Sequence, residues 1–190
     1  MIYDPQFDAY DNILYVDSDV IAVPDAPNIF DIECKHVACW TERHSPGSIA
    51  GPGYRKGSDK YKEVEKAFRE FNAPLIDSEM SGAPTRILNS GVIVFSKEAR
   101  ILARRTFDDW ILWFDRIWYP KWITLDQLYI AAMFNKYKFD VKEIDDKWNV
   151  TLEWYPPNQC PKSYFYHFSN AGKKDIVPFY NQHYSRTGEE

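Results

Sequence analysis

The sequence predicts an α/β domain in which a mixed sheet is flanked by helices. Short apolar runs of strand length alternate with longer stretches of helical period. Several of the apolar runs end in polar side chains, as the strands of a ligand-binding sheet do. The chain of 190 residues is long enough to bury a substantial core, so we expect a single domain over residues 1–190.

Composition excludes several classes of protein. The net charge of −5 and the isoelectric point of about 5.4 argue against a nucleic-acid or anionic-membrane surface. No apolar run is long enough for a membrane span and no signal peptide precedes Asp4, so we expect a cytoplasmic location. The three cysteines lack zinc-finger spacing and are expected to be free thiols.

The first predicted strand covers residues 13–17 and runs into Asp17 and Asp19. Its continuous apolar run is typical of a strand buried on both faces. In extended geometry the two carboxylates point the same way and Ser18 points opposite. They repel each other unless a cation such as Mg²⁺ or Mn²⁺ lies between them. The alternative is an ordinary acidic turn after a strand.

The rest of the chain continues the alternation of strands and helices. An Asn-Ser-Gly turn or bulge at residues 89–91 interrupts one apolar run, and the Gly-rich stretch 45–58 is expected to be a long loop. Further strands are expected at 36–40, 86–96, 139–144 and 164–168, helices at 59–71, 97–119 and 125–136, and a loop at 145–158.

Polar residues at the ends of these elements are expected to converge on one crevice, because ligands of open α/β sheets bind outside the strand ends. A neutral imidazole from His167 would complete a divalent-metal site beside the two aspartates; the alternative is a structural histidine at the rim. Lysines after a glycine are suited to phosphate oxygens. The converging groups are Asp17 with Asp19, Asn89-Ser90-Gly91, Asp126-Gln127, Trp148-Asn149, and His167 with Lys173.

Taken in order, these segments resemble the motifs of metal-dependent GT-A glycosyltransferases, most closely the galactosyltransferase and glycogenin-like group of family 8. The resemblance covers most of residues 10–175. It implies a GT-A-like fold and transfer of a sugar from a nucleoside-diphosphate sugar to an acceptor hydroxyl, with retention of configuration as in the family. The donor is expected to be a UDP-sugar, the acceptor a glycan, lipid or protein hydroxyl, and the cofactor Mn²⁺ or Mg²⁺.

The resemblance also implies roles for individual residues. Asp17, Asp19 and His167 would hold the ion. Asp126 and Gln127 would form the catalytic pair beside the anomeric carbon. The residues expected to bind the donor are Asp17, Ser18, Asn89, Ser90, Gly91, Asn149, Gly172 and Lys173.

Two departures from the family pattern stand out. In the last motif Asn170 takes the place of a glycine and Gly172 comes two residues late, so either Lys173 or Lys174 could meet the diphosphate. Few residues precede the first strand, whereas family members place a nucleotide-binding half before it. We therefore expect a chain that lacks most of that N-terminal half.

Two other functions are compatible with parts of the pattern. In a haloacid-dehalogenase-like phosphohydrolase, Asp17 would be the nucleophile and Asp19 the general acid, with Ser96 and Asp145-Asp146 in later motifs. That interpretation leaves the segments around Asn89, Asp126 and His167 unexplained. A non-catalytic nucleotide-sugar or glycan-binding domain would bind metal without transferring sugar.

Overall fold

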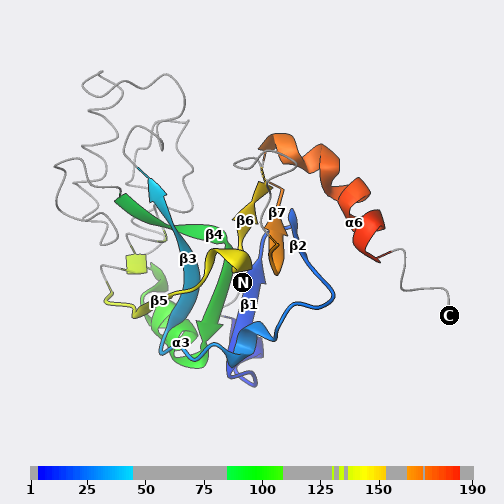
Figure 1. Cartoon of the computed structure of the whole chain (residues 1–190). Coiled ribbons are helices and arrows are strands. Elements are labelled where there is room, and N and C mark those ends of the chain that lie inside the picture. The colour runs from blue at the N-terminus through cyan, green and yellow to red at the C-terminus, as the bar shows by residue number, and fades with distance from the viewer. Residues whose placement is uncertain are drawn as a thin grey trace, which may run out of the picture.

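The computed structural model describes residues 4–44, 85–108, 130, 133–134, 137–152, 162–168 and 170–184. The loop expected at 45–58 and the helix expected at 59–71 lie outside these residues. Strands of two sheets occupy the centre and helices lie on the outside (Figure 1). The elements in chain order are η1 (Pro5–Phe7), β1 (Asn12–Val16), β2 (Val20–Ala22), η2 (Ile29–Asp31), β3 (Val37–His44), β4 (Thr85–Ser96), α3 (Lys97–Arg105), β5 (Val141–Glu143), η3 (Asp146–Trp148), β6 (Val150–Thr151), β7 (Phe165–His167), η5 (Asn170–Asp175) and α6 (Ile176–Tyr184).

Both sheets are mixed, which confirms the predicted fold class. The larger sheet has the order β1-β4-β3-β5, with antiparallel pairs on both sides of β4 and a parallel pair between β3 and β5. The smaller sheet has the order β2-β7-β6, antiparallel and then parallel. The predicted strands at 36–40, 139–144 and 164–168 correspond to β3, β5 and β7.

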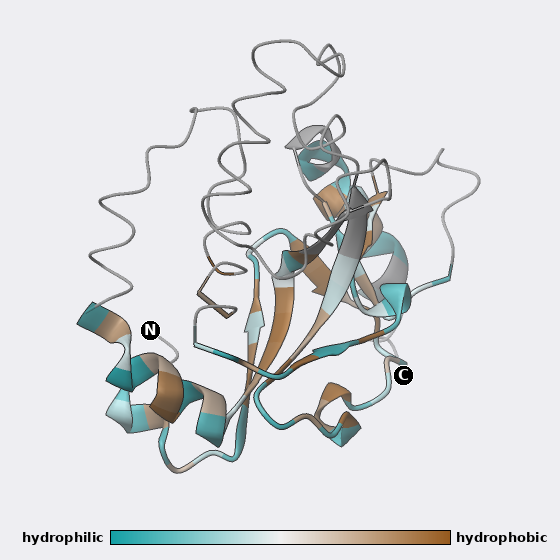
Figure 2. Cartoon of the chain, turned by 90° about the vertical axis from the view of Figure 1, so that its left-hand side faces the viewer, coloured by the Kyte–Doolittle hydropathy of each residue, from teal (hydrophilic) through white to brown (hydrophobic). Residues whose placement is uncertain are grey.

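The core is built around β4, whose side chains alternate between two apolar clusters. Ile93 and Phe95 pack on the side of α3, and Val92 and Val94 pack on the side of the smaller sheet, where they meet Phe165. The central strands are accordingly hydrophobic along most of their length (Figure 2). A third cluster joins the outer face of the smaller sheet to α6. The strand buried on both faces is therefore β4.

The expectation that the first strand is buried on both faces is wrong. In the described part of the chain β1 lies at the edge of the larger sheet and pairs with β4 alone. Tyr15 and Val16 are 40% and 37% exposed. An apolar run predicts the strand but does not distinguish an edge position from a central one.

The single helix expected over 97–119 is interrupted: α3 ends at Arg105, Thr106 lies in a turn, and residues 107–108 are helical again. The hydroxyl of Thr106 donates to the carbonyl oxygens of Leu102 and Ala103 at 3.0 and 3.3 Å. Such side-chain bonds compete with helical backbone pairing and favour a terminus. Residues 109–119 lie outside the described part of the chain.

The stretch 145–158, expected to be a loop, contains η3 and β6. Trp148 anchors it: its ring lies 4.8 Å from that of Tyr164 and 5.6 Å from that of Phe165, centroid to centroid. Burial of this large ring stabilises the segment that follows it. The next residue, Asn149, is thereby held at a fixed place in the interior.

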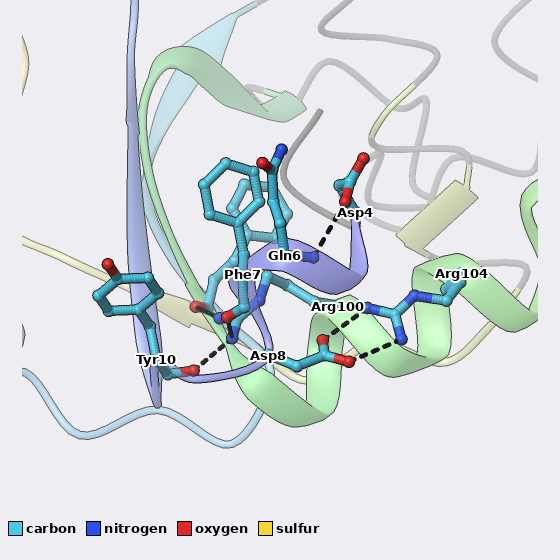
Figure 3. A network of polar contacts seen from close by, with 8 residues as sticks. Asp4, Gln6, Phe7, Asp8, Tyr10, Arg100 and Arg104 are labelled. Atoms are coloured by element: carbon cyan, nitrogen blue, oxygen red, sulfur yellow. Dashed lines mark hydrogen bonds and ion pairs between the residues drawn. The ribbon is translucent and has the colours of Figure 1, made fainter.

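Arginines of α3 hold the N-terminal segment (Figure 3). The guanidinium of Arg100, fully buried, donates to the carbonyl oxygens of Phe7 and Tyr10 and to that of Phe95. Arg104 forms a two-point ion pair with Asp8, at 2.6 and 3.0 Å. The turn that precedes β1 is thus fixed to the helix that follows β4.

Two cysteines are described, and both are free, as expected. Cys39 lies in the core of β3, where burial raises the pKa of its thiol to about 12. Within the described residues, no helix combines the length and the apolar character that crossing a membrane requires.

Candidate metal centre

The turn from Asp17 to Val20 carries the chain from one sheet to the other. The Asp17 amide donates to the Gly91 carbonyl of β4 at 2.9 Å, and the Asp19 carbonyl accepts from the Phe168 amide at 2.8 Å. The turn is closed by the Val20 amide, which donates to the Asp17 carbonyl at 3.1 Å. A turn, rather than the extended geometry we expected, therefore places the two carboxylates.

The side chains of Asp17, Asp19 and His167 converge, as the sequence predicts. Each offers one ligand atom, and these atoms all lie within 4.8 Å of one another. Nε2 of His167 is 3.3 Å from Oδ1 of Asp19, and the histidine is only 7% exposed. Two carboxylates and an imidazole at this spacing can coordinate a divalent ion.

Two further side chains contact the aspartates. Nζ of Lys173 lies 3.0 Å from Oδ2 of Asp19, at a position where the lysine side chain is 59% exposed and the aspartate 14%. The Tyr15 hydroxyl donates to Oδ1 of Asp17 at 2.6 Å. Our sequence reasoning missed Tyr15. Its spacing of two from Asp17, which puts both on one side of a strand, was the available signal.

Behind His167 lies a buried row of amides. Nδ1 of His167 is 3.2 Å from Oδ1 of Asn149, and Nδ2 of Asn149 donates to Oδ1 of Asn89 at 2.5 Å. The same Asn89 oxygen accepts from the Gly91 amide at 2.8 Å. Asn149 is completely buried and Asn89 is 3% exposed. The row therefore connects the backbone of β4 to the imidazole.

A bulge in β4 makes this arrangement possible. The register with β3 shifts so that Trp40 alone stands opposite residues 89–92. This confirms the interruption expected at Asn-Ser-Gly. A Cβ atom at Gly91 would lie 2.6 Å from both Cε1 and Nδ1 of His167, so the imidazole packs directly over this glycine.

The remaining predicted site residues within the described part of the chain lie in the bulge of β4, in the aspartate turn and in η5. Ser90 is buried in the bulge, Ser18 is exposed in the aspartate turn, and Gly172 lies within η5. Lys174 is exposed. Asp126 and Gln127 lie outside the described residues.

Comparison with known proteins decides the family. Residues 2–177 match the family model described as glycosyl transferase family 8. The chain belongs to this family. No curated protein matches the sequence of this family 8 member.

Solved glycosyltransferase structures share the fold. The bifunctional glycosyltransferase WbbM superposes with a TM-score of 0.58 at 17% identity, covering 99% of this chain and 36% of WbbM. The galactosyltransferase LgtC, solved in complex with donor and acceptor sugar analogues, gives 0.52 at 11% identity, covering 92% of this chain and 62% of LgtC. The family 8 chain thus spans only part of the length of each.

Membership of family 8 replaces the phosphohydrolase alternative. Asp145, which that alternative placed in an acidic motif, caps η3 by accepting from the Lys147 amide at 2.9 Å. This backbone bond holds the pKa of the Asp145 carboxyl below its ordinary value. Its role in the described structure is that of a helix cap.

Proposed function

We propose that this glycosyltransferase domain uses a divalent ion to transfer a sugar from a nucleoside-diphosphate sugar to an acceptor hydroxyl. The observation that carries the proposal is the convergence of Asp17, Asp19 and His167 from two sheets, with Lys173 beside them. Two carboxylates this close together favour positive charge beside them, which Lys173 supplies to Asp19 and a bound ion would supply to both.

The three converging side chains would hold the ion, Mn²⁺ or Mg²⁺. When bound, such an ion neutralises the charge that develops on a departing diphosphate. The ammonium group of Lys173 adds a second positive charge on the solvent side of Asp19. It is suited to contact phosphate oxygens and to stabilise the same leaving group.

The contact between Lys173 and Asp19 suggests how donor binding proceeds. Because Asp19 would also hold the ion, Lys173 would be free to turn from this carboxylate toward an arriving diphosphate once the site is filled. Its 59% exposed side chain has room to turn. Ser18, Ser90 and Gly172 are proposed to border the donor.

The reacting centre itself is proposed from the family pattern. Asp126 and Gln127 would lie beside the anomeric carbon, where Gln127 supports a positively charged sugar on the face away from the leaving group. Retention of configuration, a UDP-sugar donor, and a glycan, lipid or protein acceptor belong to the same proposal.

Substitution of Asp19 by asparagine tests the function. This change keeps the shape of the side chain and removes its charge, so Mn²⁺-dependent binding of the nucleotide sugar should weaken more than about 100-fold, beyond the loss typical of residues behind the ligands. Titration calorimetry over a panel of nucleoside-diphosphate sugars, UDP-sugars first, measures the effect and identifies the donor.

Asp11→Asn is the matched control. Asp11 is exposed just before β1, so the same loss of charge there should leave binding unchanged. Equal affinities for the wild type and Asp19→Asn would overturn the proposal. Donor binding without transfer or donor hydrolysis would instead identify a binding domain.

A further inference from the structure

We infer that Asn89 and Asn149 are positioning residues, which select the tautomer of His167 that can bind a metal. The inference rests on the proposed metal site and adds a role for residues behind it. Three elements far apart in the sequence contribute: β4 carries Asn89, Asn149 directly precedes β6, and β7 ends at His167. The three strands are labelled in Figure 1.

The chain of reasoning begins at a backbone amide. The N–H of Gly91 can only donate, and it donates to the Asn89 side chain at 2.8 Å. The atom of Asn89 that faces it must therefore be the carbonyl oxygen Oδ1. A flipped Asn89 amide would bring two donors together, so the backbone fixes the orientation of this side chain.

The same logic passes to the next amide. Oδ1 of Asn89 accepts at 2.5 Å from Asn149, so the Asn149 atom that faces it is the donor Nδ2. Its other atom, Oδ1, then faces Nδ1 of His167 at 3.2 Å. An oxygen that only accepts requires a proton on that ring nitrogen.

A neutral imidazole with its proton on Nδ1 has a lone pair on Nε2. Nε2 is the atom that points at Asp19 Oδ1, 3.3 Å away. Two acceptors then face each other, an arrangement that a metal ion between them relieves. Metal-binding histidines commonly donate their second ring N–H to a neighbouring oxygen, which fixes ring orientation and tautomer.

Burial allows the row of amides to select one tautomer of His167. Asn149 is fully buried and Asn89 and His167 are 3% and 7% exposed, so water does not readily substitute for a missing partner. The imidazole also packs over Gly91, since a Cβ there would lie 2.6 Å from Cε1 and Nδ1 of the ring. One backbone N–H thus sets the polarity of the whole row.

Variants at Asn89 test the row of amides, because Asn89 reaches the imidazole through Asn149. Asn89→Asp keeps an acceptor oxygen for Gly91 and Asn149, whereas Asn89→Leu has similar size and removes it. Asn149→Leu removes the partner of His167 itself. If the two asparagines only fill space, the leucine variants should be tolerated and the buried carboxylate should be the most damaging change.

The first readout is the protonation of the ring nitrogens in the metal-free protein, by ¹⁵N correlation spectroscopy with the imidazole neutral. His167→Gln assigns the signals. We expect a proton on Nδ1 in the wild type and in Asn89→Asp, and a mixture or a proton on Nε2 in both leucine variants. The second readout is Mn²⁺ affinity, which should fall about 10–100-fold in the leucine variants and less in Asn89→Asp.

A wild-type proton on Nε2 would overturn the inference even in a working glycosyltransferase. So would an Asn89→Leu protein with the proton still on Nδ1 and unchanged Mn²⁺ affinity. The proposed function fails differently: Nδ1 is protonated in the wild type, yet no nucleotide sugar binds with Mn²⁺. Thermal melts of each variant confirm that the compared proteins are folded.

Discussion

At the scale of single residues, Gly91 gives the imidazole of His167 its place. In Gly91→Ala the new Cβ would lie 2.6 Å from Cε1 and Nδ1 of the ring, so the ring has to move. We expect Mn²⁺ affinity to fall at least about 10-fold, as for other residues behind a metal ligand. The overpacking should cost about 1–3 kcal/mol of unfolding free energy. Calorimetry and urea unfolding measure the two effects.

Val92→Ala is the control for this prediction. Val92 is fully buried on the neighbouring position of β4, and its truncation destabilises the core without entering the row of amides. It should lose stability and keep Mn²⁺ affinity. An alanine at position 91 that binds Mn²⁺ as the wild type does would contradict the packing argument.

The sequence predicted that Asp17, Asp19 and His167 converge, but not the contacts behind them. These three residues could be predicted because each stands at the end of an apolar run and has a side chain that can bind a metal ion. The contact between Asn89 and Asn149 depends on a bulge in β4 that pairs one residue of β3 with several of its own. Residues 60 positions apart meet there. The Asn-Ser-Gly sequence predicts the interruption of the strand but not the size of the register shift or the contact with Asn149 that results from it.

At the scale of elements, α3 holds the turn before β1 through Arg100 and Arg104 (Figure 3). In Arg100→Met, carbonyl oxygens of Phe7 and Phe95 lose a charged donor in a fully buried position. We expect a loss of about 3–6 kcal/mol of unfolding free energy, since the two charged hydrogen bonds contribute about 1.5–3 kcal/mol each. Urea unfolding measures it.

Arg104→Gln should be the milder variant, because its ion pair with Asp8 is partly exposed. Its effect should also depend on pH. The hydrogen bond from Arg104 holds the pKa of Asp8 below its ordinary value of 3.8. The pair therefore stabilises the fold above that value, and the difference from wild type should vanish as the pH falls through the lowered pKa. Equal losses for both variants at neutral pH would contradict this ranking.

The elements themselves were largely predictable where an apolar run was long. β3 and β7 were predicted from apolar runs, β5 from the alternation of apolar and polar residues over 139–144, and the bulge in β4 from its Asn-Ser-Gly sequence. The break at Thr106 was not predicted, because the apolar stripe continues past it and residues 107–108 are helical again. The hydroxyl bonds of Thr106 to Leu102 and Ala103 accompany the break. The helical period of the apolar residues therefore predicts that α3 exists, whereas the side-chain bonds of Thr106 to backbone carbonyls mark where it ends.

At the scale of the whole molecule, the α/β class was predictable and the division into two sheets was not. Strands β2 and β7 have three residues each and pair across most of the chain length. Strands this short carry too little pattern to predict their partners. The division matters because the aspartate turn bonds to β4 on one side and to Phe168 on the other.

An ion held by Asp17, Asp19 and His167 would therefore join the two sheets, and its binding should raise the melting temperature. By mass action, Mn²⁺ at 100 times its dissociation constant stabilises the folded state by about 2.7 kcal/mol. Scanning fluorimetry over a Mn²⁺ series measures the shift, which should be absent in His167→Gln. His36→Gln is the matched control. His36 is a buried histidine outside the cluster of Asp17, Asp19 and His167, and its Nδ1 accepts from the backbone amide of residue 140 at 2.7 Å. That variant should melt lower than the wild type yet keep the full Mn²⁺ shift, and an equal shift in His167→Gln would show that the ion binds elsewhere.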